Sequence, residues 1–253
     1  WEGFVVAQAI RLMRAEHDIG ELTRATEPKI TRWLANPGWS TSTRATYWGH
    51  LHSYLVWCLK TGMIDKDPMI NLPRPKVPKR APRPAPADSY ARIMDQAEDR
   101  WRISATLARY AGLRASEIAR LKRSDVDETT IRVKGKGGRV DTLPAHPAIW
   151  ALVRDLPDGH LVVGPRGVAY SPAGISPAFG TRGRAMGLPR PLGLHMLRHA
   201  YATTLLRGKE HGGAGANLRV TQELMRHASP ATTAVYTQVT DEDRRRAVLD
   251  LAA

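Results

Sequence analysis

NLPRPKVPKRAPRPAP, residues 71–86, contains six prolines and five basic residues and decides how the chain is organised. Each proline removes a backbone donor and keeps the preceding residue out of the helical region. The stretch therefore predicts an extended, semi-rigid connector rather than a helix or strand. We expect it to separate a domain at residues 1–70 from a domain at residues 87–253.

Upstream of the connector, apolar residues recur at helical spacing in three segments, at residues 4–16, 21–35 and 40–60. Ser40 begins a Ser/Thr cluster suited to a helix N-cap, and Thr61-Gly62 ends the same segment. Residues 1–70 are therefore predicted to form a small all-helical domain.

Downstream of the connector, TTIRVK at 129–134 and RVDTL at 139–143 are short β-prone segments joined by GKGG. This pattern predicts a β-hairpin with a glycine-rich turn. Helices are expected at 87–99, 101–111, 116–122, 147–155, 172–186, 194–207, 217–227, 231–239 and 241–251, and HGGAG at 211–215 is expected to be a flexible loop. The predicted fold class is mainly α with a small antiparallel β-hairpin: an all-helical N-terminal domain followed by an α+β domain.

The 253-residue chain carries a formal net charge of +14, with an excess of +6 in residues 1–86 and +8 in residues 87–253. A basic excess spread over both domains favours a polyanionic partner, above all nucleic acid and less often an anionic membrane surface. An arginine-rich proteome would explain the same charge without such a partner. No apolar run is long enough to span a membrane, and a single cysteine excludes an intramolecular disulfide, so we expect a cytoplasmic protein.

The segment His195-Met196-Leu197-Arg198-His199 contains the first chemical candidates. His195 and Arg198 share one face of a predicted helix and suit a phosphate, because arginine grips it with two donors and histidine moves a proton near neutral pH. His195 and His199 have a spacing that also permits metal binding. However, Met196 stands where the HExxH zinc motif requires Glu, which argues against a metalloprotease. The sequence predicts no metal site and no cofactor. The structural alternative for each histidine is a packed or exposed side chain without a ligand.

His227 and Tyr236 stand nine residues apart in HASPATTAVY, with a Ser-Pro turn between them. A tyrosine nucleophile must lose a proton whose usual pKa is about 10, which costs about 4 kcal/mol at pH 7. Nearby cations and a base must offset that cost. The alternative for Tyr236 is a packed aromatic ring with a solvated hydroxyl.

Three further candidates precede these residues. Arg114 follows Gly112-Leu113 at a helix junction, Glu117 is placed to orient a neighbour, and Lys136 lies within the glycine-rich turn. Each alone is as readily a surface residue. Together with the histidines and Tyr236 they suit metal-free transesterification at a phosphodiester, because fixed cations stabilise the extra negative charge of the transition state.

The order of these motifs resembles the tyrosine site-specific recombinase, or phage integrase, family, and most closely its Xer-like and phage-integrase branch. The resemblance covers about residues 40 to 245 and is carried by four stretches: AGLRASEIARLKRSDVD, VKGKGGRVDTLP, HMLRHAYATTLL and ELMRHASPATTAVYTQV. It implies a helical core-binding domain, a catalytic domain, and a metal- and ATP-independent DNA strand transferase.

The resemblance also implies a role for each candidate. Tyr236 would attack the scissile phosphate and form a 3′-phosphotyrosine. Arg114 and Arg198 would clamp the non-bridging oxygens of the phosphate, and His227 would also bond the phosphate. Lys136 would protonate the leaving oxygen, and His195 would accept the tyrosine proton or bind the phosphate. Glu117 and His199 would support these residues.

For the assembly, the resemblance implies a C-shaped clamp around duplex recombination sites (attachment or core sites) in a bacterial host. Four protomers would synapse two duplexes through a Holliday junction, as in phage integration and excision, with accessory directionality or DNA-bending proteins as further partners. A segment at about 241–253 would dock on a neighbouring protomer. Candidate DNA-binding residues are Arg44, Lys76, Lys79, Arg80 and Arg83.

Three features depart from the family pattern. Arg226 precedes His227 where the family usually has Gly, and the loop at 208–216 is longer than usual. The N-terminal domain is shorter by about one helix and lacks a separate arm-site domain, as expected if the chain was trimmed before Trp1.

Two alternatives to a recombinase remain: a type IB topoisomerase-like nicking-closing enzyme, and a catalytically silent DNA-binding protein of the same fold. All six expected catalytic positions are filled, which argues against the silent protein. The helical domain, the connector and the docking segment favour recombination over relaxation alone.

Overall fold

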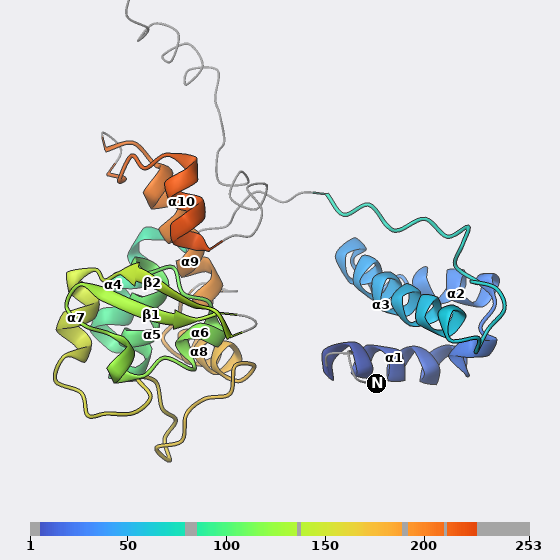
Figure 1. The fold of residues 1–253 in the computed structure, drawn as a ribbon, viewed down its shortest axis with the longest axis horizontal. Helices are drawn as coiled ribbons and strands as arrows, with labels where there is room; N and C mark the ends of the chain where they lie inside the picture. The colour runs from blue at the N-terminus through green and yellow to red at the C-terminus, as the bar shows by residue number, and fades with distance from the viewer. Residues whose placement is uncertain (1–5, 79–84, 136–137, 189–191, 210–211, 227–253) are drawn as a thin grey trace, which may run out of the picture. The chain divides into compact units, whose positions relative to one another are not determined.

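A computed structural model of the chain describes residues 6–78, 85–135, 138–188, 192–209 and 212–226 (Figure 1). The chain divides into two compact units, residues 1–80 and 81–253. Each unit buries an apolar core of its own, so each can be described by itself.

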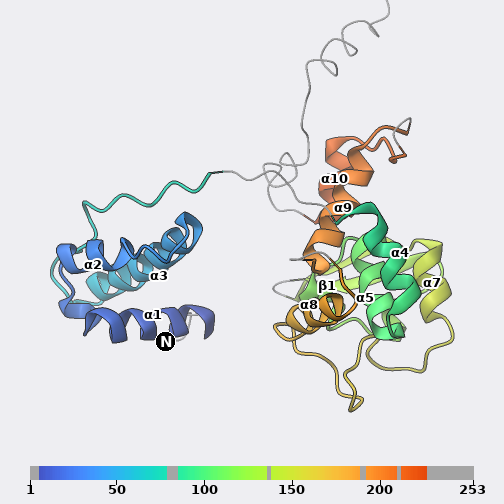
Figure 2. The same ribbon diagram turned by 180° about the vertical axis from the view of Figure 1, so that it is seen from behind.

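In its described residues, the first unit contains three α-helices and a short 3-10 helix, at Val6–Ile19 (α1), Leu22–Arg24 (η1), Glu27–Leu34 (α2) and Thr41–Lys60 (α3). The two views of the ribbon show α1 and α3 lying side by side (Figures 1 and 2). The single helix predicted over 21–35 is wrong. Pro28 lies in the first turn of α2, the part of a helix that tolerates a residue without an N–H, so the helix begins at Glu27.

Aliphatic side chains of α1, α2 and α3 form the core of this unit, with Leu12, Ile30, Leu51 and Leu55 almost fully buried. Aromatic side chains pack against this core, and among them the rings of Trp39 and Tyr47 stack with centroids 4.4 Å apart. The Ser40 hydroxyl accepts the Thr43 N–H at 3.1 Å, as expected for the N-cap of α3.

The second unit is built around Asp99–Tyr110 (α5), which is buried on most of its surface and contacts Ala87–Gln96 (α4), Ala115–Ile118 (α6), Pro147–Val153 (α7) and Leu194–Leu206 (α9). The remaining helices of its described part are Arg123–Asp125 (η2), Ile175–Ala185 (α8) and Leu218–Met225 (α10). A helix enclosed in this way fixes the positions of the elements around it.

Strands Thr130–Lys134 (β1) and Val140–Pro144 (β2) form the predicted hairpin, antiparallel with Lys134 opposite Val140. Ile131, Val133 and Leu143 face the core, which matches the period of two expected for a half-buried strand. The mainly α fold with one small antiparallel sheet is confirmed.

Several predicted helices have different ends. The helix predicted at 87–99 ends at Gln96, the one at 116–122 is the single turn of α6, and the one at 172–186 begins at Ile175, after a turn in which Gly174 N–H donates to Ser171. The helices predicted at 231–239 and 241–251 lie outside the described residues.

The long loop at 208–216 returns to the end of α9. The N–H groups of Ala214, Gly215 and Ala216 donate to the carbonyls of Thr204, Arg207 and Leu205 at 2.8 to 2.9 Å. The last turn of a helix leaves carbonyls without intrahelical donors, so this loop supplies them. The predicted loop is present in its described residues and is bonded to the end of α9, and its flexibility stays a prediction.

Candidate active site

Arg114 and Glu117 lie at the start of α6. The Glu117 carboxylate accepts the Arg114 backbone N–H at 2.7 Å through Oε2 and the Arg114 Nη1 at 3.0 Å through Oε1. The Arg114 side chain is 44% exposed, whereas that of Glu117 is 5% exposed. A buried carboxylate therefore holds an arginine whose guanidinium reaches the surface.

Arg226, at the end of α10, joins this pair. Its Nη2 donates to Glu117 Oε2 at 2.6 Å, and its backbone carbonyl accepts Arg114 Nη2 at 3.2 Å. The Arg226 side chain is 8% exposed. One carboxylate thus lies between two guanidinium groups from distant parts of the sequence.

These contacts set the protonation state of Glu117. Burial alone would raise its pKa, but the Arg114 N–H and the charges of Arg226 and Arg114 outweigh burial and hold the pKa below its ordinary value of 4.5. The carboxylate is therefore ionised at neutral pH and remains an acceptor for both arginines.

Arg198, on α9, is buried beside this group. Its guanidinium donates to the carbonyl of Gly112 and, at 2.6 Å, to the carbonyl of Met225. The N-terminal half of α9, the segment after α5 and the last residue of α10 therefore meet at the Arg198 side chain.

The Gly112 position requires glycine for two reasons. Its φ is +58°, and a Cβ there would overlap the ring of Tyr201 and lie 3.3 Å from the sulfur of Met225. Tyr201 is on α9, one turn from Arg198, so this close approach sets the distance between the end of α5 and α9.

His195 and His199 lie one turn apart on α9, with ring centroids 4.2 Å apart in an edge-to-face arrangement. Burial and the charges of Arg198 and Arg114 lower the pKa of His195. Burial and the charges of His195 and Arg198 lower the pKa of His199 to about 4. Both rings are therefore neutral at pH 7, and a neutral imidazole can accept a proton.

The structure brings together five of the eight candidate residues, namely Arg114, Glu117, His195, Arg198 and His199. Lys136, His227 and Tyr236 lie outside the described residues, although His227 follows Arg226 directly. The chemical roles given to all eight remain predictions.

The candidate DNA-binding residues belong to α3 and the connector. Arg44 donates through Nη2 to the Asn36 carbonyl at 3.3 Å, so part of its guanidinium fixes a neighbouring loop. Lys76 is exposed, and Lys79, Arg80 and Arg83 lie outside the described residues.

Two features of the site were missed from the sequence. Arg226 was noted as added charge, but its pairing with Glu117 joins residues 109 positions apart, and no local pattern indicates it. The carbonyls of Gly112 and Met225 are invisible to a search for side-chain motifs, although a glycine directly before Leu113-Arg114 was a usable signal.

Within the described residues, no group of three or more His, Cys, Asp or Glu side chains is placed to hold a metal ion. In the same part of the chain, no helix has the length and apolar character needed to cross a membrane.

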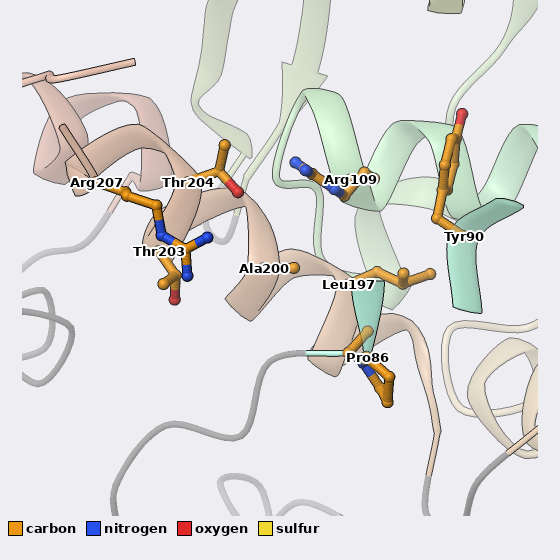
Figure 3. A pocket seen from close by; sticks show the side chains of 9 residues that line it. Pro86, Tyr90, Arg109, Leu197, Ala200, Thr203, Thr204 and Arg207 are labelled. Carbon is orange, nitrogen blue, oxygen red and sulfur yellow. The ribbon is translucent and has the colours of Figure 1, made fainter. Parts of the chain in front are cut away.

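A separate pocket of about 270 Å³ lies on another face of α9, between that helix, α5 and the start of α4 (Figure 3). Its polar lining comes from Arg109, Arg207, Thr203 and Thr204, and Tyr90 stands at one side. It contains none of the candidate catalytic residues, so it is distinct from the site described above.

Comparison with known proteins supplies the family. Residues 85–243 match the phage integrase family. The chain is 30% identical to the tyrosine recombinase XerC of Chromohalobacter salexigens, over 94% of this chain and 78% of that protein. It is 32% identical to XerC of a Mycobacterium species, over 93% and 84%.

Solved structures have the same fold. The integrase from mycobacterium phage Brujita is 32% identical, with a TM-score of 0.52 over 98% of this chain and 87% of that one. The Tn1549 transposon integrase, in complex with transposon right end DNA, is 19% identical, with a TM-score of 0.74 over 100% and 96%. Because the family match covers more than half of the chain and includes the elements that build the arginine and histidine cluster, this chain belongs to the phage integrase family of tyrosine recombinases.

Proposed function

We propose that the chain cuts and rejoins duplex DNA at specific sites through a 3′-phosphotyrosine on Tyr236 and a Holliday junction. The observation that carries the proposal is the group of two arginines beside a neutral histidine, on elements that lie within the family match. Such a group fits a phosphodiester, whose charge grows in the transition state.

The proposed chemistry needs no metal and no ATP. The Tyr236 oxygen attacks the scissile phosphorus, a phosphorus–oxygen bond to tyrosine forms, and the bond to the 5′-oxygen breaks. The tyrosine proton passes to a base, and Lys136 donates a proton to the leaving 5′-oxygen. The 5′-hydroxyl of the partner strand then attacks the phosphotyrosine. A new phosphodiester forms, and the bond between phosphorus and the Tyr236 oxygen breaks.

Arg114 and Arg198 are proposed to bind the non-bridging oxygens, together with His227. The exposed guanidinium of Arg114 is available to a phosphate, and Glu117 fixes its orientation. Arg198 is buried, and its bonds to two backbone carbonyls fix the position of its charge beside the proposed phosphate site.

His195 is proposed to accept the tyrosine proton or to bind the phosphate. Its lowered pKa supports the first role, because a ring that is neutral at pH 7 carries a nitrogen lone pair that can take up a proton. His199, packed edge-to-face on His195, is proposed as the support of that ring.

Duplex DNA is the proposed partner. The +14 charge supports it, and so do the relatives solved in complex with DNA. We further propose a core-binding domain at 1–70, a connector at 71–86 and a catalytic domain at 87–253. Its segment at 241–253 would dock on a neighbour in a tetramer, in the cytoplasm of a bacterial host. The similarity to a phage integrase supports integration and excision as the biological reaction.

The test begins with a pool of randomised duplexes, each nicked near its centre so that a cleaved strand is released and the protein stays attached. Duplexes that become covalently bound in the presence of EDTA are recovered and sequenced. We expect a shared inverted repeat with a central spacer, and strand exchange between two intact copies of it. Relaxation of a supercoiled plasmid without strand exchange would indicate the topoisomerase-like alternative, and retention of DNA without covalent bonds would indicate a silent DNA-binding protein.

A further inference from the structure

Arg226 has an unusual backbone conformation. It follows the last residue of α10 with φ 52° and ψ 47°, and no other non-glycine residue in the described ranges has a positive φ. Left-handed residues at helix ends are usually glycine or asparagine, because a Cβ disfavours this region. A long, charged side chain at such a position calls for an explanation from its contacts.

The conformation turns both ends of the residue toward Arg114 and Glu117. The carbonyl of Arg226 accepts Arg114 Nη2 at 3.2 Å, while its guanidinium donates to Glu117 Oε2 at 2.6 Å. Glu117 Oε1 in turn accepts Arg114 Nη1 at 3.0 Å. Arg114 is therefore held along two edges of its guanidinium, and Arg226 contributes to both.

The charges around Glu117 give the Arg226 side chain a second effect. Glu117 is balanced by Arg114 from its own helix and by Arg226 from α10. The described charged groups of the helices packed against α6 have other partners. On α5, Arg100 pairs with Glu98, Arg102 pairs with Asp99, and Arg109 lies over the Tyr110 ring. On α8, Arg182 pairs with Glu98 and Arg184 donates to the Thr181 hydroxyl.

On α9, Arg198, His195 and Tyr201 face the same cluster. The charge of Arg226 lowers the pKa of Tyr201, although burial raises it by more. The charge of Arg198 lowers the pKa of His195. Arg226 is thus the principal charge, besides Arg114, that acts on the Glu117 carboxylate among the described residues.

We propose that Arg226 is a positioning residue for Arg114: its carbonyl fixes the outer edge of that guanidinium, and its own guanidinium holds Glu117 in place. The inference rests on the proposed function, in which Arg114 binds the scissile phosphate. Arg226 itself is buried and acts through its two partners.

The matched variants are Arg226→Met, Arg226→Lys and Arg219→Met. Arg219 is also on α10, but its side chain is 72% exposed and pairs with Glu223 at the surface. Arg226→Met removes the cation and keeps most of the side-chain volume. Arg226→Lys keeps the charge but loses the planar fork.

The first measurement is the single-turnover rate of covalent adduct formation from pH 4 to 8, on the nicked duplex captured by the unaltered protein. We expect Arg226→Met to lower the rate roughly 10- to 100-fold at pH 7 with DNA affinity retained, because Arg114 loses its orientation. The acid limb of the profile should move to higher pH, because the Glu117 carboxylate loses a stabilising charge. Arg226→Lys should lose less of the rate and shift the acid limb less than Arg226→Met does. Arg219→Met should leave the rate and the acid limb unchanged.

Glu117→Gln provides the coupling test. If Arg226 acts through Glu117, Arg226→Met should slow the rate far less in a Glu117→Gln background than in the unaltered chain. Equal losses in both backgrounds, or an Arg226→Met profile that matches the unaltered one, would overturn the proposal.

The second measurement needs no DNA. Titration of the Glu117 carboxyl carbon by NMR should give a pKa below its ordinary value in the unaltered chain and in Arg219→Met, and a higher one in Arg226→Met. An unchanged Glu117 titration in Arg226→Met contradicts the inference about Arg226. Absence of any adduct from the unaltered protein contradicts the proposed function instead, so the two failures are distinguishable.

Discussion

At the scale of single residues, Glu117 is the side chain on which the described site depends most. It is buried, it accepts one backbone and two guanidinium donors, and its pKa is held below its ordinary value. A buried carboxylate paired in this way is costly to remove, because the two arginines are left without their counter-charge.

We therefore expect Glu117→Gln to lower the free energy of unfolding by about 3 kcal/mol at pH 7. Since the folded pKa is lowered, the ionised carboxylate stabilises the fold above pH 4.5, and this contribution is lost as the pH falls through the folded pKa. The variant should therefore lose part of the acid dependence below pH 4.5. Urea unfolding at several pH values checks both points.

Glu223→Gln is the control for that experiment. Glu223 pairs with Arg219 on the surface, where a pair contributes less than about 1 kcal/mol. A Glu117→Gln variant that unfolds like Glu223→Gln at every pH would show that the buried cluster is not a stabilising element.

His199 also makes stability depend on pH, but here burial and nearby charges destabilise the charged form of the side chain. Its folded pKa is about 4, below the ordinary 6.5, so the unfolded chain takes up the proton first. Stability is full above pH 6.5 and falls as the pH drops from 6.5 toward 4. His199→Gln should therefore flatten this part of the urea-midpoint profile. The same slope in His199→Gln and the unaltered chain would refute the assignment.

At the scale of elements, the site is placed by the meeting of α5, α6, α9 and α10. The close approach of Gly112 to Tyr201 sets the spacing of α5 and α9, and the same glycine presents a carbonyl to Arg198. Stability and the orientation of Arg198 are therefore coupled at one backbone position.

We predict that Gly112→Ala lowers the free energy of unfolding by about 3 kcal/mol, from left-handed strain and from overlap with the Tyr201 ring. Gly167→Ala separates the two causes, because Gly167 has φ +73° but open space around its Cβ position. That control should lose only about 1 kcal/mol. Similar losses for both variants, measured by urea unfolding, would show that the contact with Tyr201 carries no strain.

Sequence reasoning identified most elements because their signals are local. The hairpin followed from β-prone runs around GKGG, and α3 followed from Ser40 and helical spacing. The break between η1 and α2 was missed because apolar spacing continues across Pro28, whose backbone constraint decides the matter. The bonds between the 208–216 loop and α9 were missed because they depend on where the chain returns.

The site was predictable to the extent that side chains carry it. Arg114, His195 and Arg198 were selected for their chemistry, and the structure places them together. The two carbonyls that hold Arg198 and the second guanidinium on Glu117 depend on tertiary contacts, which no spacing in the sequence encodes.

At the scale of the whole molecule, the two units have separate cores. Leu55→Ala, at a fully buried position of the first unit, should reduce hydrogen-exchange protection in α1, α2 and α3 and leave α5 unchanged. Leu107→Ala, buried in the second unit, should do the reverse. Loss of protection in both units from either variant would contradict the independence of the two cores.

Tyr236 is the residue proposed to form the covalent bond with DNA. The most direct test digests the adduct with trypsin and nuclease and locates the attached nucleotide by mass spectrometry. Cleavage after Arg226 and Arg244 yields the peptide 227–244, in which Tyr236 is the single tyrosine. We expect a nucleotide joined through its 3′-phosphate to Tyr236 and no adduct from Tyr236→Phe. A nucleotide on another residue, or an adduct that persists in Tyr236→Phe, would contradict it.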